Sequence, residues 1–190
     1  MAIKILYIHG YAGTGKGRTV QGLNKLLGDE VEIHAPYFAY NFSTVAEIEQ
    51  YIEKAKKAMH EFRPDVVIGS SFGGFITTFL NGYSRILINP CLLPSERAYL
   101  LSPEMSPEEI EKLKALETSH DINPKMKLEL YGLFGLNDEL FSYLELFKKL
   151  YGTKQVYTMQ SGHRIDMENV ENCLIPLIRQ VLEDNANFRD

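Results

Sequence analysis

Short runs of apolar, β-branched residues recur along the chain, and each has the length of a buried strand. Most are separated by stretches in which apolar residues return every three or four positions, as on one face of a helix. Val45, Ile48 and Ile52, for example, share such a face. Strands that alternate with helices indicate a parallel sheet covered on both sides. The predicted strands are 3–8, 30–35, 65–69, 85–89, 127–134 and 154–159, and the predicted helices are 16–28, 44–62, 73–82, 139–151 and 167–183.

These elements predict an α/β protein, a three-layer α/β/α sandwich with a mostly parallel six-stranded sheet. If the second strand lies outside the first and the other strands extend the opposite way, the strand order is 2-1-3-4-5-6. The direction of the connections then reverses between the first and third strands. An α/β sheet opens a crevice at such a point, at the carboxyl ends of its strands. We therefore expect a ligand site at that edge.

One long connection interrupts the alternation of strands and helices, because no strand is predicted from residue 91 to residue 125. Within it, Ser106 and Glu109 match a capping box, in which the serine caps a helix over 107–118 and the glutamate reaches back. A long connection inside a compact chain is often a lid over a site. We expect one domain over residues 1–190 with a cap at 91–125; the alternative is a surface helix that only covers the sheet.

Composition and charge exclude several classes of protein. The 190 residues are 45% hydrophobic and 24% charged, with a net charge of −5. Nucleic acids and anionic membranes bind basic surfaces, so neither is expected as a partner. The first residues have too short an apolar run for a signal peptide, and Cys91 and Cys173 form no C-x-x-C motif. We expect a cytoplasmic protein with reduced cysteines, no membrane span and no metal; the sequence leaves its oligomeric state open.

The third predicted strand ends in a glycine-rich turn with a catalytic pattern. Gly69, Ser71 and Gly73 match G-x-S-x-G, the nucleophile elbow, between a strand and a helix. The turn is strained, and strand and helix approach closely there, so the neighbouring positions must lack side chains. Ser71 would project above the sheet at a helix N-terminus, which favours developing negative charge. The alternative is a glycine-rich helix start without chemistry.

A nucleophilic serine needs a base to take its proton and an acid to orient that base. The chain order Ser, Asp, His puts the acid after a later strand and the histidine after the last one. Asp138 and His163 occupy those positions. Glu139 is the nearest rival acid, whereas Asp166 is better explained as the N-cap of the last helix.

The loop after the first predicted strand, HGYAGTGKG, admits two interpretations. It resembles a phosphate-binding P-loop, but a P-loop needs Ser or Thr after its lysine to hold Mg²⁺, and glycine follows Lys16. Alternatively, the backbone N–H of Tyr11 joins that of Phe72 in an oxyanion hole. We favour the second interpretation, with His9 in a structural hydrogen bond, and keep nucleotide binding as a remote alternative.

Together these motifs resemble the α/β-hydrolase superfamily, and most closely its small YqiA-like group of bacterial esterases. The resemblance covers essentially the whole chain and implies the triad Ser71, Asp138 and His163, with oxyanion donors at Tyr11 and Phe72. Larger members carry two further strands before the first one here, so the expected fold is a minimal version with a short helical cap. The matching motifs, in chain order, are His9-Gly10, Gly69-x-Ser71-x-Gly73-Gly74, Ile88-Asn89-Pro90, Gly135-x-x-Asp138 and Gly162-His163.

The predicted function is hydrolysis of small carboxylic esters through an acyl-enzyme, without a cofactor. A thioesterase or amidase would use the same residues, and a panel of acyl substrates would separate them. A non-catalytic binding module would usually lack a member of the triad, and none is missing. The residues expected to line the substrate pocket are Tyr37, Phe38, Tyr40, Leu92 and Leu93.

Overall fold

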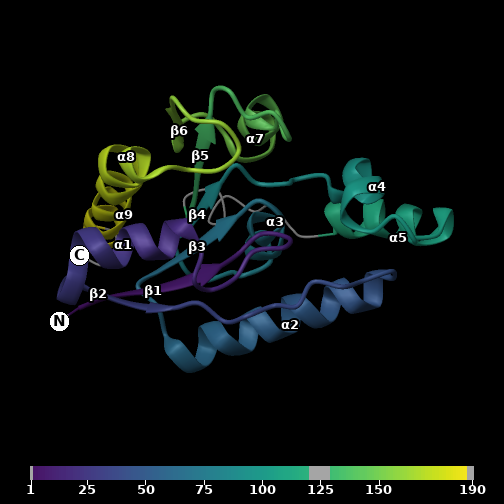
Figure 1. Ribbon diagram of the computed structural model, residues 1–190, viewed down its shortest axis with the longest axis horizontal. Helices are drawn as coiled ribbons and strands as arrows, with labels where there is room; N and C mark the ends of the chain where they lie inside the picture. Colours follow the sequence, from purple (N-terminus) through teal and green to yellow (C-terminus); the bar gives the residue numbers. More distant parts are fainter. Residues whose placement is uncertain (1, 120–128, 188–190) are drawn as a thin grey trace.

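In the computed structural model, a parallel sheet carries helices on both faces (Figure 1). The structure describes residues 2–119 and 129–187. Its six strands lie in the order β2-β1-β3-β4-β5-β6, and every neighbouring pair is parallel. The predicted strand order is therefore confirmed. The strands are β1 (Ile3–Ile8), β2 (Val31–His34), β3 (Val66–Ser70), β4 (Arg85–Ile88), β5 (Leu130–Gly135) and β6 (Val156–Met159).

All six strands overlap the predicted apolar runs, and β3 and β5 each extend one residue further, to Ser70 and Gly135. Residues 127 and 128 of the fifth run lie outside the described residues. The central strands β3 and β4 are buried almost throughout, whereas the edge strands β2 and β6 have exposed positions. Strands buried on both faces need apolar side chains at successive positions. This explains why the central runs show no alternation of apolar and polar residues.

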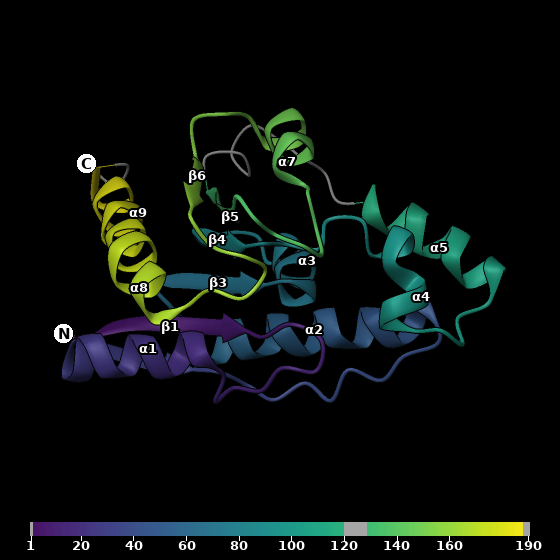
Figure 2. The ribbon, with the colours of Figure 1, turned by 45° about the horizontal axis from the view of Figure 1, so that its top comes forward.

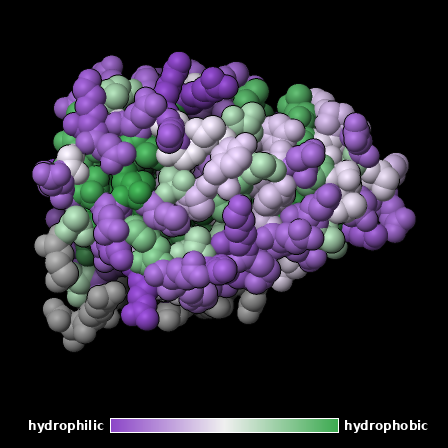
Figure 3. All heavy atoms as spheres, turned by 60° about the horizontal axis from the view of Figure 1, so that its bottom comes forward, coloured by the Kyte–Doolittle hydropathy of each residue, from purple (hydrophilic) through white to green (hydrophobic). Residues whose placement is uncertain are grey.

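Two apolar layers attach the helices to the sheet. Figures 1 and 2 show the helices on its two sides. On one face lie α1 (Arg18–Leu27) and α9 (Ile175–Asn187); on the other lie α2 (Val45–Phe62), α3 (Phe72–Thr78) and α7 (Leu144–Tyr151). The surface on the α2 side is largely hydrophilic (Figure 3). Within the described residues, no helix is both long and apolar enough to cross a bilayer. The chain also contains three short helical segments next to α1 and α9: η1 (Gly28–Glu30), α8 (Met167–Asn169) and the π-turn η3 (Val170–Leu174).

Three predicted helices have different bounds in the structure. The third ends at Thr78 rather than at residue 82. α7 begins at Leu144 rather than at residue 139, because Asp138 Oδ1 accepts hydrogen bonds from the backbone of Leu140 and Phe141 and holds that stretch as a turn. The last helix, predicted over 167–183, extends to Asn187 and contains a π-turn just before Pro176, which has no N–H to donate.

The connection predicted as a cap contains η2 (Pro94–Arg97), α4 (Ala98–Leu101) and α5 (Pro107–Glu117). Both ribbon views place α4 and α5 at one end of the molecule, beside the N-terminal end of α2. Residues 120–125 of the predicted cap lie outside the described residues. Ser106 caps α5 as predicted, but Glu109 does not reach back to it. Its carboxylate instead accepts a hydrogen bond from Val45 N, at 2.7 Å, because packing brings the first unpaired amide of α2 within reach.

A buried carboxylate fastens the other end of α5. Glu117 accepts hydrogen bonds from Ser95 N, at 2.6 Å, and from Ser95 Oγ, at 2.9 Å. Burial raises the pKa of Glu117, and the two hydrogen bonds from Ser95 oppose that rise. Carboxylates therefore tie α5 to η2 at one end and to α2 at the other.

We predict that Glu117→Ala destabilises the protein by about 1–3 kcal/mol, because it leaves the buried Ser95 donors without an acceptor. The control is Glu111→Ala, which removes only a surface ion pair with Lys114 and should cost within about 0.5 kcal/mol. Urea denaturation of both variants measures the difference. If the two variants are equally stable, the hydrogen bonds between Glu117 and Ser95 contribute nothing to the stability of the protein.

Candidate active site

Ser71 occupies the turn between β3 and α3 with a backbone conformation that L-residues rarely adopt. Its φ is 55° and its ψ is −124°. Backbone hydrogen bonds on both sides hold the turn: Ser71 N donates to Ile88 O at 3.0 Å, and Ser71 O accepts from Gly74 N at 2.9 Å and from Cys91 N at 3.0 Å. A strained backbone conformation persists only where the surrounding contacts enforce it, and residues with such conformations cluster at functional sites.

The glycines around Ser71 are required by close packing of backbone on backbone. A Cβ at Gly73 would overlap the carbonyl oxygens of Ile8 and His9, and a Cβ at Gly69 would overlap the side chain of Thr77. A Cβ at Gly10 would lie 2.8 Å from Ser71 Cβ. The turn after β1 and the start of α3 therefore lie directly against each other.

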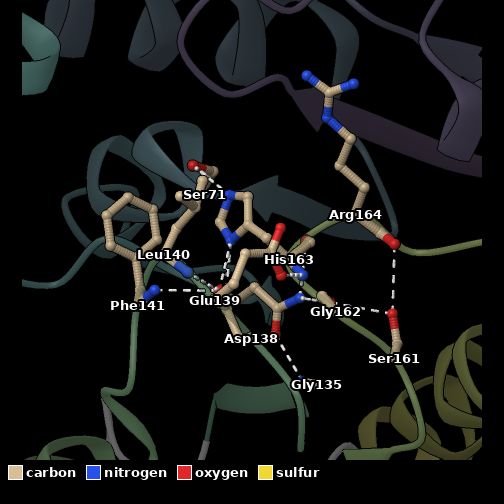
Figure 4. A network of polar contacts seen from close by, with 11 residues as sticks. Ser71, Gly135, Asp138, Glu139, Leu140, Phe141, Ser161, Gly162, His163 and Arg164 are labelled. Carbon is tan, nitrogen blue, oxygen red and sulfur yellow. Dashed lines mark hydrogen bonds and ion pairs between the residues drawn. The ribbon is translucent and has the colours of Figure 1, made fainter.

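Ser71, His163 and Asp138 form a continuous hydrogen-bonded chain (Figure 4). His163 Nε2 lies 3.0 Å from Ser71 Oγ, and His163 Nδ1 lies 3.0 Å and 3.1 Å from the two carboxylate oxygens of Asp138. The side chains of His163 and Asp138 are 9% and 5% exposed. The parallel sheet thus brings together three residues separated by up to 92 positions in the chain.

The two neighbouring acids contact different parts of His163. Asp138 lies against the ring, whereas Glu139 Oε2 accepts a hydrogen bond from the His163 backbone N–H at 2.9 Å. That bond lowers the pKa of Glu139. The Phe141 ring and the imidazole pack nearly perpendicular to each other, with centroids 4.8 Å apart. Asp166, expected as a helix cap, accepts from Asn169 N at 2.8 Å and is confirmed in that role.

Asn89 is a structural member of the site that the sequence analysis assigned no role. It is 1% exposed, and its Nδ2 donates to the carbonyls of Gly162, at 3.1 Å, and His163, at 2.8 Å. Its Oδ1 accepts from Gly135 N at 2.6 Å. Asn89 therefore joins the loop that carries His163 to the end of β5. The only sequence signal is the Asn-Pro pair after the fourth strand.

The amides of Tyr11 and Phe72 donate no hydrogen bond to an acceptor in the described parts of the chain. Phe72 is completely buried, and buried amides without an acceptor are rare in folded proteins. The carbonyl of the peptide that carries the Tyr11 N–H, that of Gly10, lies 2.8 Å from His9 Nδ1 and accepts from Gly13 N at 2.9 Å.

His9 is held in a single tautomer. Its Nε2 accepts a hydrogen bond from Phe38 N at 2.9 Å, which leaves Nδ1 to donate to Gly10 O. Burial lowers the pKa of His9, and this keeps the ring neutral. The structural hydrogen bond predicted for His9 is confirmed.

The five residues predicted to line a pocket occupy different environments. Phe38 and Tyr40 are buried against the His9 ring, Leu92 is buried, Leu93 is half-buried and Tyr37 is exposed. None of them lines the 300 Å³ cavity beside Tyr11, which is formed by residues 41–43, Glu47 and residues 101–104. In the described residues, no three His, Cys, Asp or Glu side chains gather as metal ligands.

Comparison with known structures shows the fold. Est1E from Butyrivibrio proteoclasticus superposes with a TM-score of 0.66 at 18% identity, covering 97% of this chain and 89% of its own. Mouse alpha/beta hydrolase domain-containing protein 10 gives 0.70 at 13% identity, covering 95% and 89%. The ydeN product of B. subtilis gives 0.64 at 14%, covering 96% and 100%. The chain therefore has an α/β-hydrolase fold with a six-stranded sheet.

Comparison by sequence identifies the family. No curated protein sequence matches the chain significantly. The model of an uncharacterised protein family, UPF0227, matches residues 4–178, which is nearly the whole chain and includes all the residues of the site described above. The chain therefore belongs to the YqiA-like UPF0227 family of α/β-hydrolase-fold proteins.

Proposed function

We propose that the protein is a serine hydrolase that cleaves carboxylic esters through an acyl-enzyme. The observation that carries this proposal is the hydrogen-bonded chain from Ser71 Oγ through His163 to Asp138. A serine on a strained elbow, a histidine within 3.0 Å of it and a carboxylate on the other ring nitrogen are the parts that nucleophilic acyl transfer requires. The likeness to Est1E, which has been solved with ferulic acid bound, supports an ester as the substrate.

In the proposed reaction, His163 Nε2 takes the proton of Ser71 while Oγ attacks the acyl carbon. Asp138 accepts from His163 Nδ1–H, fixes the tautomer and stabilises the imidazolium that forms. The imidazolium then protonates the leaving alcohol. Water then attacks the acyl carbon and gives a proton to the same histidine. The histidine passes this proton to Ser71 Oγ as the acid leaves, so the serine is regenerated without a cofactor.

The amides of Tyr11 and Phe72 are proposed to bind the oxyanion. Both lack an acceptor in the described chain, and Gly10 and Gly73 keep their loops close to Ser71. His9 positions the first donor indirectly, because it holds the carbonyl of the same peptide. Each oxyanion donor typically contributes a factor of about 10²–10³ to the rate.

The same residues would also cleave thioesters or amides. The difference lies in the leaving group, because an amine must be protonated to depart whereas an alcohol or thiol is a better leaving group. We propose the ester because of the likeness in fold to Est1E, which has been solved with ferulic acid bound. A panel of matched acyl esters, thioesters and anilides measures the preference.

We expect a fluorophosphonate to form one adduct on Ser71. Ser71→Ala should abolish this labelling and lower hydrolysis of p-nitrophenyl acetate by about 10⁶-fold, because no other group replaces the nucleophile. Ser70→Ala, on the adjacent residue, is the matched control and should keep both. Peptide mapping by mass spectrometry locates the adduct. An adduct on Ser70, or an active Ser71→Ala variant, would refute the mechanism.

Asp138→Asn should lower kcat by about 10⁴-fold with little change in stability, because an amide at this position favours the wrong tautomer of His163. Glu139→Gln should cost less than about tenfold, since a glutamine oxygen can still accept from the His163 backbone N–H. Steady-state kinetics of both variants compare the two acids. If only Glu139→Gln loses activity, the orienting acid is Glu139.

His9→Phe should lower kcat by about 10-fold or more with a smaller change in KM, because the Tyr11 peptide loses the hydrogen bond from His9 that holds its carbonyl.

The His9→Phe variant should also flatten the pH dependence of the free energy of unfolding. Burial lowers the pKa of His9 in the folded protein. As the pH falls below about 6.5, His9 therefore takes up a proton in the unfolded chain before it does so in the folded one. The stability that His9 contributes is therefore present above that pH and lost below it. Urea denaturation at several pH values tests this; parallel profiles for the two proteins would contradict it.

A further inference from the structure

The ring of Phe141 links the proposed base to η2, the first helical segment of the connection after β4. The backbone N–H of Phe141 donates to Asp138 Oδ1 at 3.0 Å, and its ring packs against the His163 imidazole (Figure 4). The guanidinium of Arg97, the last residue of η2, lies over the same ring, with Cζ 5.9 Å from its centroid. A single aromatic ring therefore contacts both a permanently charged group and the proposed base.

The positive charge of Arg97 has no counter-charge among the residues that the structure describes. The side chain makes no ion pair there, and its Nε is buried without a hydrogen-bond partner. The hydroxyl groups of Tyr99 and Tyr143 raise the pKa of Arg97, and Tyr99 has the larger effect. Both hydroxyls are neutral at pH 7, so they leave the charge uncompensated. A buried, unpartnered donor is uncommon in a folded protein and requires an explanation.

Two carboxylates next to η2 are bound by other donors. Glu96 Oε2 accepts a hydrogen bond from the Tyr143 hydroxyl at 3.1 Å. Both oxygens of Glu117 accept from Ser95, one from its backbone N–H and one from its hydroxyl. The bonds to Ser95 also fix the backbone two residues before Arg97. The guanidinium is therefore held by a fixed segment, and neither acid serves as its partner.

The contacts of Phe141 indicate which part of an ester would reach Arg97. The leaving oxygen must receive its proton from His163 Nε2, so the alcohol part of the ester lies beside the imidazole. Phe141 packs against that imidazole, and Arg97 lies over Phe141. A negative group on the alcohol part is therefore well placed to bind the guanidinium. A guanidinium binds a planar carboxylate through two parallel hydrogen bonds, and one arginine balances its single charge.

We propose that Arg97 determines specificity by binding a carboxylate on the alcohol part of the substrate ester. The inference rests on the proposed esterase function, which assigns the alcohol part to the His163 side. The affinity of Arg97 for a carboxylate is a separate property, and it can be measured with or without catalysis.

The test uses two aryl acetates of the same size, the anionic 4-acetoxybenzoate and its neutral isostere 4-acetoxybenzamide. The measured quantity is the ratio of kcat/KM for the anionic ester to kcat/KM for the neutral one. Comparing this ratio between variants cancels the chemical reactivity of the two phenols. Arg97→Gln should lower the ratio by about tenfold, with kcat/KM for the neutral ester changed by less than about twofold. Arg97→Lys keeps the charge without the planar fork, and its ratio should be intermediate.

Arg164→Gln is the matched control, because Arg164 is exposed and directly follows His163 in the chain. In Figure 4 the Arg164 guanidinium and the Phe141 ring lie on opposite sides of the imidazole. The control removes the same charge and should leave the ratio unchanged. An unchanged ratio in Arg97→Gln, or an equal loss in both variants, would overturn the inference and leave the esterase proposal intact.

If neither acetate is hydrolysed, the esterase proposal fails, and calorimetric titration with 4-hydroxybenzoate tests Arg97 by itself. Saturable binding that Arg97→Gln weakens by about tenfold, and that Arg164→Gln leaves unchanged, supports a carboxylate site at Arg97. The absence of binding, or an equal affinity in wild type and Arg97→Gln, overturns it.

Discussion

The contact of α3 with the end of β1 is the constraint on which the site depends. At Gly73 the helix backbone lies against the carbonyl oxygens of Ile8 and His9, with no room for a side chain between them. This contact forces the chain to leave β3 through a tight turn and places Ser71 at a positive φ. It also sets the turn after β1 beside the serine. The proposed nucleophile and the proposed oxyanion donors are thus positioned by one packing interaction.

On the other side of Ser71, polar side chains hold His163, the proposed base. The His163 ring lies against Asp138, its backbone N–H donates to Glu139, and its carbonyl accepts from Asn89. Three side chains from two segments, the loop after β5 and the turn after β4, determine both the position and the orientation of the imidazole. Preorganisation of this kind is what general-base catalysis requires, because a reacting group must lie within hydrogen-bonding distance before the proton moves.

The sequence predicted those features that depend on local pattern and strand order. Apolar runs located the strands, and glycines before and after Ser71 located the elbow. Features that join distant segments were missed. Glu109 matched a local capping box, yet it binds Val45, and only tertiary packing brings these two residues together. Asn89 and the polar cavity beside Tyr11 were not predicted for the same reason. The residues that bind Asn89 and those that line the cavity are far apart in the sequence. The catalytic roles themselves remain proposals.

The backbone of Ser71 also has an evolutionary consequence. A residue with a side chain at φ 55° and ψ −124° is strained, at a cost of about 1–3 kcal/mol, whereas glycine adopts positive φ without that penalty. A lineage under selection for stability alone would therefore gain by replacing this serine with glycine, at a position where a single substitution suffices. Retaining the hydroxyl of the proposed nucleophile therefore costs stability, which is the trade-off between stability and activity known for active sites.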